Sequence, residues 1–238
     1  DITITIEPGD GGSYSEFLKT KDSVGEFPDM TEMRDTAMYV RAGKVAPLSD
    51  DVKALFTSTV EFDGVTYTAP MSGANTMGIM YNKKYFADNG LEIPKTWDEF
   101  YDAAVTLTKD GQYGAAFSCS PNDLLSTRYL NYYVVSAGSS LLNDDLTANL
   151  TSKEAIDGIN FWLKVYKNCS PAETINYTVN DHATLFYQGK TAFDFNSGFM
   201  IGGVQNNTPE IAQYVRCAPL PRITDSDPIY SAEASHIP

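Results

Sequence analysis

The sequence predicts an α/β fold, because strand-like segments alternate along the chain with segments that carry helical caps and helical periodicity. With 238 residues, the chain is long enough for one large domain or two lobes. Two capping boxes indicate helix starts, Thr96 with Glu99 and Thr151 with Glu154. Asp63-Gly64, between two alternating runs, is a strong hairpin signal.

The first part of the chain begins with an expected strand. Ile2, Ile4 and Ile6 alternate with threonines, which is the period of a half-buried strand. The elements expected after it are, in order, a helix over 14–21, a helix over 34–42 with Gly43 as its C′ residue, the hairpin over 60–68, a buried strand over 76–81 and a helix from Lys83 to Asn89-Gly90.

The second part continues the alternation. The expected elements are, in order, a helix over 96–108, a strand over 113–117, helices over 124–137 and 155–166, a helix ending at Tyr187, a strand over 191–195, a helix over 198–205 and a strand over 214–220. In the helix over 155–166, Ile156, Ile159, Leu163 and Tyr166 fall on one face, as in an amphipathic helix.

Charge and composition exclude several classes of function. Asp and Glu total 31 against 17 Lys and Arg, a net charge of −14 that repels nucleic acid and anionic membrane surfaces. No apolar run approaches the ~20 residues of a membrane-spanning helix. The segment Asp1–Ile6 has no features of an export signal. The spacing of Cys119, Cys169 and Cys217 and the presence of only two histidines predict no disulfide framework, metal or cofactor.

Catalytic motifs are weak. Gly189-Lys190-Thr191 looks like the end of a phosphate-binding loop, but Thr184 stands where that motif needs glycine. The chain has no Gly-x-Ser-x-Gly elbow. Its many carboxylates leave open a glycoside hydrolase that uses two acids. No catalytic residue is therefore assigned.

The aromatic content points towards carbohydrate. The chain has 15 Tyr, 12 Phe and two Trp, several of them at predicted strand-to-helix turns, where α/β sheets bind ligands. Flat apolar faces with polar edges suit sugar rings.

A family resemblance rests on several segments in a common order. Residues 81–91 read YNKKYFADNGL and 93–100 read IPKTWDEF, which resembles the signature of family 1 extracellular solute-binding proteins. These are sugar-binding receptors of bacterial ABC importers, related to maltose-binding protein. Further similar segments are GEFPD at 25–29, AGKVAPL at 42–48, FYQGKTAF at 186–193 and APLP at 218–221.

The resemblance implies a two-lobed, type II periplasmic-binding-protein-like fold that is incomplete at both ends. It implies a first lobe over 1–110, a second lobe over 111–220, and a crossover over 221–238 that returns toward the first lobe. It also implies a monomeric, extracytoplasmic receptor that closes its lobes on a mono- or oligosaccharide and delivers it to a membrane permease without chemistry.

The family's ligand-contact loops map onto named positions. They imply a cleft loop with Met33, Arg34 and Asp35, where Asp35 equally suits a helix N-terminus. Polar contacts are expected from Ser72 and Asn75, and from Asn122 and Asp123. Asn196 and Phe199 match the turn that carries an aromatic platform, although a Phe there equally suits a core.

Two alternatives stay open. One is a glycoside hydrolase that acts through carboxylates such as Asp35 and Asp123. The other is a receptor for a non-sugar solute such as a polyamine.

Overall fold

The computed structural model describes residues 3–7, 14–33, 35–56, 59–69, 75–121, 123–145, 147–229 and 233–234. The chain divides into two compact units, one of Asp1–Asn75 with Glu233–Pro238 and one of Thr76–Ala232. Residues 76–110, expected in the first lobe, thus fall in the second unit. The reason is that the strand and helices of this stretch pack into the sheet of the second unit.

The first unit is small and mainly helical. Its elements are α1 (Tyr14–Ser23), α2 (Thr36–Arg41), α3 (Asp50–Lys53), β1 (Val60–Phe62) and β2 (Val65–Thr68). The strands pair antiparallel around Asp63 and Gly64, which have φ angles of 51° and 77°, so the predicted hairpin is confirmed. Leu18, Met33 and Tyr39 form its buried core.

The strand expected at the start of the chain is not formed. Residues 3–7 are neither helix nor strand, and Ile4 and Ile6 are 81% and 82% exposed. An alternating pattern becomes a strand only where a neighbouring strand accepts its hydrogen bonds, and none of the described strands pairs with this segment.

The second unit is built on a four-stranded sheet in the order β5-β6-β4-β7. Its strands are β4 (Gly78–Asn82), β5 (Tyr113–Ala115), β6 (Thr191–Asn196) and β7 (Val215–Ala218). β5 is parallel to β6, whereas β4 is antiparallel to both β6 and β7. Gly78 pairs with Asn196, and Ile79 with Ala218. The carboxyl ends of β5, β6 and β7 therefore meet the start of β4 at one end of the sheet, named here the carboxyl edge.

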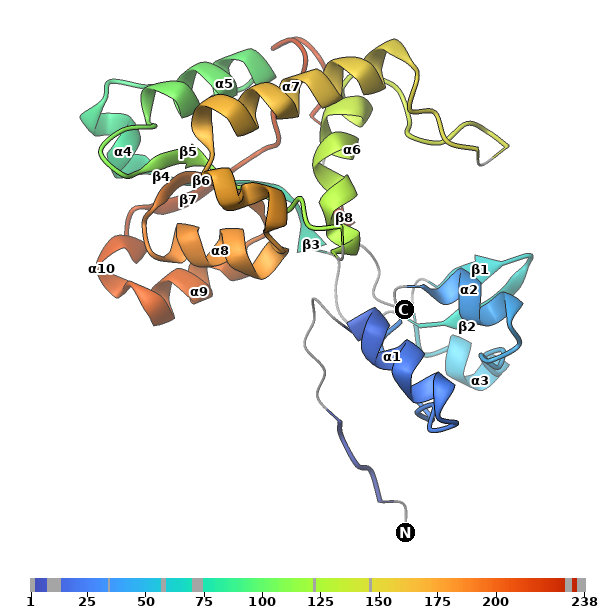
Figure 1. The fold of residues 1–238 in the computed structure, drawn as a ribbon. Coiled ribbons are helices and arrows are strands. Elements are labelled where there is room, and N and C mark those ends of the chain that lie inside the picture. Colours follow the sequence, from blue (N-terminus) through green and yellow to red (C-terminus); the bar gives the residue numbers. More distant parts are fainter. Residues whose placement is uncertain are drawn as a thin grey trace. The chain divides into compact units, whose positions relative to one another are not determined.

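Two further short strands pair with each other, and two helices follow β5 in the chain. β3 (Asn75–Thr76), directly before β4, pairs with β8 (Glu233–Ala234). The 3-10 helix η1 (Leu124–Ser126) leads into α6 (Thr127–Ser136), which stands beside the carboxyl edge in Figure 1.

Helices cover both faces of the sheet (Figure 1). α5 (Trp97–Thr106) and α7 (Lys153–Cys169) lie on one face, and α8 (Val179–Tyr187), α9 (Phe199–Asn207) and α10 (Pro209–Ala212) on the other. α4 (Lys83–Asp88) follows β4, and η2 (Ala172–Asn176) follows α7. The predicted α/β class is confirmed for this unit, with both helix layers in place.

Helix starts follow the local sequence. The capping box at α5 is formed as predicted, with Thr96 Oγ1 accepting from Glu99 N at 3.2 Å. At α7 the capping residue is Ser152 rather than Thr151, because the Ser152 hydroxyl accepts from Ala155 N.

Aromatic packing joins α5 to the sheet. Phe100 is fully buried, with its ring centroid 4.9 Å from that of Phe193 and 5.0 Å from that of Phe195. Trp97 stacks on Phe195 at 5.9 Å. On the opposite face, Met80 belongs to an apolar cluster with residues of α8 and α9. Strand alternation therefore gives β6 one aromatic face and one face that carries Asp194 and Asn196.

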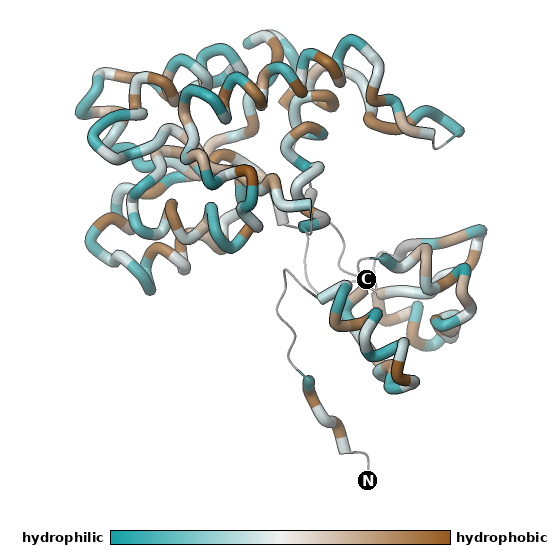
Figure 2. Tube along the Cα trace, in the orientation of Figure 1, coloured by the Kyte–Doolittle hydropathy of each residue, from teal (hydrophilic) through white to brown (hydrophobic). Residues whose placement is uncertain are grey.

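The buried face of α7 differs from the expected one. Hydrophobic and hydrophilic residues alternate along the whole helix in Figure 2. Ile156, Ile159 and Leu163 are 46%, 40% and 47% exposed. The residues that pack inward are Ala155, Gly158, Phe161, Trp162, Val165 and Cys169. The exposed stripe borders an apolar groove of about 400 Å³ beside α6 and η2.

Candidate functional site at the carboxyl edge

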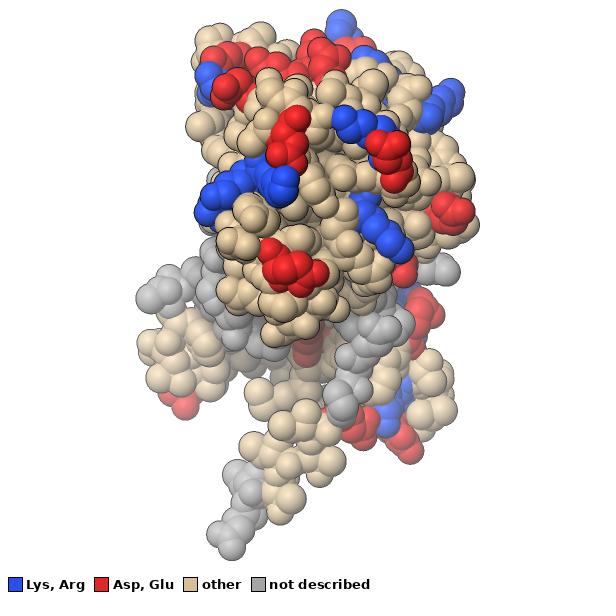
Figure 3. Space-filling view, turned by 90° about the vertical axis from the view of Figure 1, so that its left-hand side faces the viewer, with Lys and Arg blue, Asp and Glu red and all other residues tan. Residues whose placement is uncertain are grey.

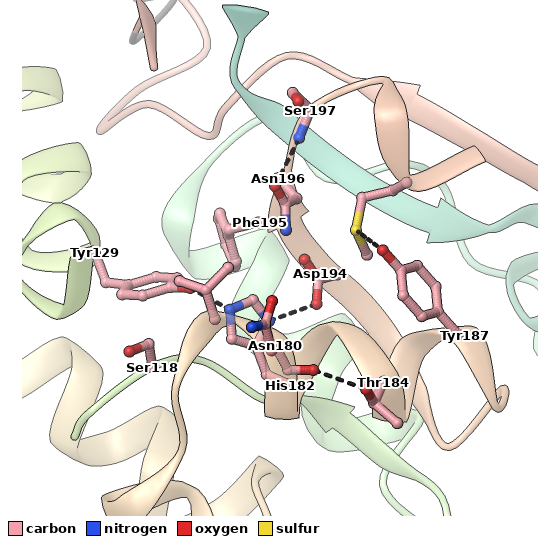
Figure 4. A network of polar contacts seen from close by, with 12 residues as sticks. Ser118, Tyr129, Asn180, His182, Thr184, Tyr187, Asp194, Phe195, Asn196 and Ser197 are labelled. Carbon is pink, nitrogen blue, oxygen red and sulfur yellow. Dashed lines mark hydrogen bonds and ion pairs between the residues drawn. The ribbon is translucent and has the colours of Figure 1, made fainter. Parts of the chain in front are cut away.

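Unpaired polar atoms gather near the end of β6. Among the described residues, Asp194 Oδ1, Asn196 Nδ2, Ser197 Oγ and Arg128 Nε are buried without a hydrogen-bond partner. The Asn196 oxygen is occupied, because Ser197 N donates to it at 3.1 Å (Figure 4). An unsatisfied buried polar group costs about 1–3 kcal/mol, so a cluster of them points to a functional use.

A buried hydrogen-bonded chain of side chains lies next to these atoms. Asp194 Oδ2 is 2.6 Å from His182 Nδ1, and His182 Nε2 is 2.7 Å from the Tyr129 hydroxyl (Figure 4). Arg128 Nη2 donates to the same hydroxyl at 3.2 Å. We name this chain the Asp194–His182–Tyr129–Arg128 relay. It ties β6, α8 and α6 together at the carboxyl edge.

Donor chemistry fixes the direction of the bond at the Arg128 end of the relay. A guanidinium only donates, so the Tyr129 oxygen accepts from Arg128, whereas the tautomer of His182 decides whether Tyr129 donates to Nε2 or accepts from it. Burial raises the pKa of the Tyr129 phenol well above its ordinary value, which keeps the phenol protonated. The relay therefore links one buried carboxylate to one guanidinium through an imidazole and a phenol.

Arg128, at one end of the relay, lies beside the backbone of Phe195 in β6. Its side chain is half-buried, and Nη2 lies 3.4 Å from the carbonyl oxygen of Phe195. Cζ lies 5.2 Å from the centroid of the Tyr129 ring. The guanidinium is therefore held beside the residue that directly precedes Asn196.

The Asp123 carboxylate accepts three hydrogen bonds from other groups of the protein. Oδ1 accepts from Leu125 N at 2.9 Å, and Oδ2 accepts from Ser118 Oγ at 2.8 Å and from Val179 N at 2.7 Å. The carboxylate is buried. In this structure it fastens the segment after β5 to the start of α8, instead of pointing an oxygen at solvent.

Phe199 presents an open aromatic face. It is the first residue of α9 and is 58% exposed. Asn196 lies three positions earlier, at the end of β6. These two predicted site residues therefore flank Ser197 and Gly198 in the turn between β6 and α9.

The remaining predicted residues divide into two groups. In the first unit, Met33 is buried in the core with Leu18, and Asp35 is the N-cap residue of α2 without a side-chain capping bond. Asn75 lies in β3. Arg34, Ser72 and Asn122 fall outside the described residues, as does the side chain of Asn75.

Sequence reasoning missed most of the polar network. Arg128, Tyr129, His182 and Asp194 were not among the predicted site residues. Tyr129 and His182 are 53 positions apart, and no motif connects them. One signal was present, because Asp194 is the one charged residue within the strand TAFDFN, all of whose residues are buried.

The described ranges also lack metal-binding and membrane-spanning features. They contain no group of three or more His, Cys, Asp or Glu side chains arranged for a metal ion. None of their helices has the length and apolarity required to span a bilayer. On the face drawn in Figure 3, acidic and basic side chains are interspersed rather than gathered by sign.

Comparison with known proteins connects the chain to one family. The model of the bacterial extracellular solute-binding protein family matches residues 1–236. A binding protein of Brucella abortus is 26% identical over 235 residues, covering 92% of this chain and 56% of the relative. The diacetylchitobiose binding protein of Streptomyces coelicolor is 26% identical over 187 residues, covering 72% of this chain and 42% of the relative.

Solved structures agree with the fold. An ABC transporter solute-binding protein of Thermotoga lettingae, bound to α-D-tagatose, matches with a TM-score of 0.79 and 24% sequence identity. The match covers 93% of this chain and 59% of the Thermotoga protein. An ABC transporter solute-binding protein of Agrobacterium radiobacter, in complex with ribitol, matches with a TM-score of 0.81 and 20% sequence identity. The match covers 94% of this chain and 60% of the Agrobacterium protein. The matched stretch thus spans between 42% and 60% of the length of these relatives.

Proposed function

The chain belongs to the bacterial extracellular solute-binding protein family, and from this premise we propose that it is the ligand-binding part of a carbohydrate receptor for an ABC importer. The proposal includes an extracytoplasmic location, transfer of the ligand to a membrane permease, and hinge closure on binding. It includes no catalytic step, in keeping with a family of binding proteins.

The observation that carries the proposal is the composition of the carboxyl edge. An exposed aromatic ring, Phe199, follows Asn196 and Ser197 in the chain, and Asn196 Nδ2, Ser197 Oγ and Arg128 Nε lack partners among the described residues. Sugars and polyols combine C–H faces with many hydroxyls, so they match a ring beside hydrogen-bonding groups. The matched structures carry tagatose and ribitol, and one relative is named for diacetylchitobiose, all of them polyhydroxylated.

Roles follow from the contacts. Phe199 is proposed to stack against the ring or carbon chain of the ligand. Asn196 and Ser197 are proposed to bond its hydroxyls, which gives specificity because an absent hydroxyl leaves a buried partner unpaired. Met33, Arg34, Asp35, Ser72, Asn75 and Asn122 stay predictions from the family resemblance. For Asp123, with three donors already bound, a role in holding the site loop is the better proposal.

Titration calorimetry on the whole protein tests this function against mono- and oligosaccharides, polyols and a polyamine. Saturable binding of a sugar or polyol without product release is expected. Phe199→Ala should weaken binding roughly tenfold, about 1.4 kcal/mol, because it removes the stacking face. Ile201→Ala is the matched control, since Ile201 is also exposed on α9 but is not a predicted contact.

Three outcomes contradict the proposal. Binding of the polyamine with no response to any sugar or polyol assigns another ligand class. Release of a hydrolysed product reinstates the glycosidase alternative. Equal losses in Phe199→Ala and Ile201→Ala remove the aromatic contact from the site.

A further inference from the structure

Resting on the proposed function, we propose that Arg128 contacts the ligand and selects sugars that carry a planar oxygen acceptor, either a carboxylate or an acetamido carbonyl. Asp194, His182 and Tyr129 act as positioning residues that hold the guanidinium in place for this contact. Neither role was predicted from the sequence, and both come from the relay and its unpaired neighbours.

The first argument is the geometry of the donors. The two recorded bonds of the Arg128 guanidinium leave from Nη2, to the Tyr129 hydroxyl and to the Phe195 carbonyl, whereas Nε has no partner among the described residues. Nδ2 of Asn196, on the next residue after Phe195, also lacks one. Both atoms can only donate. A planar oxygen with two lone pairs accepts from two such donors at once, and Arg is well suited to that geometry.

The second argument is charge. No carboxylate of the described residues lies within the 4.0 Å of an ion pair with Arg128. Asp194 is at the far end of the relay, beyond the His182 ring and the Tyr129 phenol. Asp123, the other buried acid near this edge, is occupied by three donors. Asp194 acts on the guanidinium through space, but no described carboxylate pairs with it directly, so its charge can favour an oxygen that carries negative or partial negative charge.

The third argument is the way the guanidinium is fixed. A free arginine side chain has several rotatable bonds, and its entropy opposes a defined contact. Here its position depends on the Tyr129 hydroxyl, whose direction depends on His182, whose ring is in turn held by Asp194 at 2.6 Å. The imidazole and the Asp194 carboxylate are completely buried, so this support is rigid.

Calorimetry with three related sugars tests the selectivity in the whole protein. The probes are glucuronate, N-acetylglucosamine and glucose, and comparison of the first two shows which acceptor is preferred. The wild type is expected to bind one of them at least about tenfold more tightly than glucose. Arg128→Lys keeps the charge but loses Nε and the planar fork, so the preference over glucose should fall about tenfold.

The outcomes separate the two proposals. If no sugar binds, the proposed function fails. If glucose binds as tightly as the other two, or if Arg128→Lys retains the preference, the function stands and the Arg128 proposal is overturned.

Tyr129→Phe tests the positioning role, because it removes one hydroxyl and leaves the ring in its aromatic packing. It should reduce the preference for the acceptor-bearing sugar several-fold, and add little in the double variant with Arg128→Lys. Tyr133→Phe, on the same helix, is the matched control. Equal losses for glucose and the acceptor-bearing sugar, or full additivity in the double variant, would show a merely structural effect and refute the positioning role.

Discussion

Gly114 in β5 allows α5 to lie directly against the sheet. A Cβ atom at this position would be 2.3 Å from the carbonyl oxygen of Ala104 and 2.7 Å from its Cα. Carbon atoms in contact prefer separations of about 3.5–4.0 Å, so Gly114→Ala requires a shift of roughly 1 Å. The obstacle is helix backbone, and α5 carries Trp97 and Phe100 in the aromatic core, so the shift also disturbs that packing.

We expect Gly114→Ala to lower the free energy of unfolding by about 3 kcal/mol, at the upper end of the cost of overpacking. For a protein of this size, that loss corresponds to a fall in Tm of about 6–12 °C. Urea denaturation followed by tryptophan fluorescence measures it, because Trp97 and Trp162 both lie in the core of this unit.

Gly202→Ala is the matched control. Gly202 lies in α9, and its added Cβ would meet nothing within 4 Å. Alanine is the better helix former, so this variant should gain about 0.5–1 kcal/mol. A Gly114→Ala protein within 0.5 kcal/mol of wild type, on the order of the usual scatter for neutral substitutions, would refute the close-approach argument. So would equal destabilisation by both variants.

Two further predictions follow from burial. Burial raises the pKa of Tyr132 to about 12, so its protonated form stabilises the fold, and this contribution is lost as pH rises from about 10 towards 12. Between pH 9 and 11.5 the wild type should lose about 2 kcal/mol more than Tyr132→Phe in urea titrations, and parallel losses would contradict this. Burial also raises the pKa of the Cys169 thiol to about 12, and Cys169 is inaccessible whereas Cys217 is exposed. Mass spectrometry after iodoacetamide treatment at pH 8 should find Cys217 labelled first and Cys169 labelled only in urea; early labelling of Cys169 would contradict its burial.

Local signals in the sequence were reliable where the chemistry itself is local. The Thr96–Glu99 capping box and the Asp63-Gly64 hairpin form as predicted, because each depends on atoms only a few residues apart. Ser152 caps α7 in place of Thr151 because neighbouring hydroxyls compete for the same amide groups. Asn196 and Phe199 share the carboxyl edge because a strand end and the following helix start are close in any fold.

Apolar periodicity was a less reliable guide where a helix has two apolar faces, either of which could be buried. Helix α7 has apolar residues on more than one side, and the stripe with Ile159 and Leu163 looked like its core face. The structure buries Phe161 and Trp162 instead, because these rings meet the aromatic cluster of α5 and β6. Which stripe is buried depends on the neighbouring helix and sheet.

The sequence by itself determined the α/β class, the position of most helices and strands, the family, and part of the carboxyl edge. Local hydrogen bonding and apolar periodicity determine the helices and strands, and the ordered motifs identify the family. Only the tertiary structure decided that Arg128, Tyr129, His182 and Asp194 form one relay, that Asp123 is occupied by three donors, and that the units divide at residues 75 and 76. These facts depend on contacts between residues that are distant in the sequence. The pairing of strands and the packing of helices create such contacts, and no local sequence pattern specifies them.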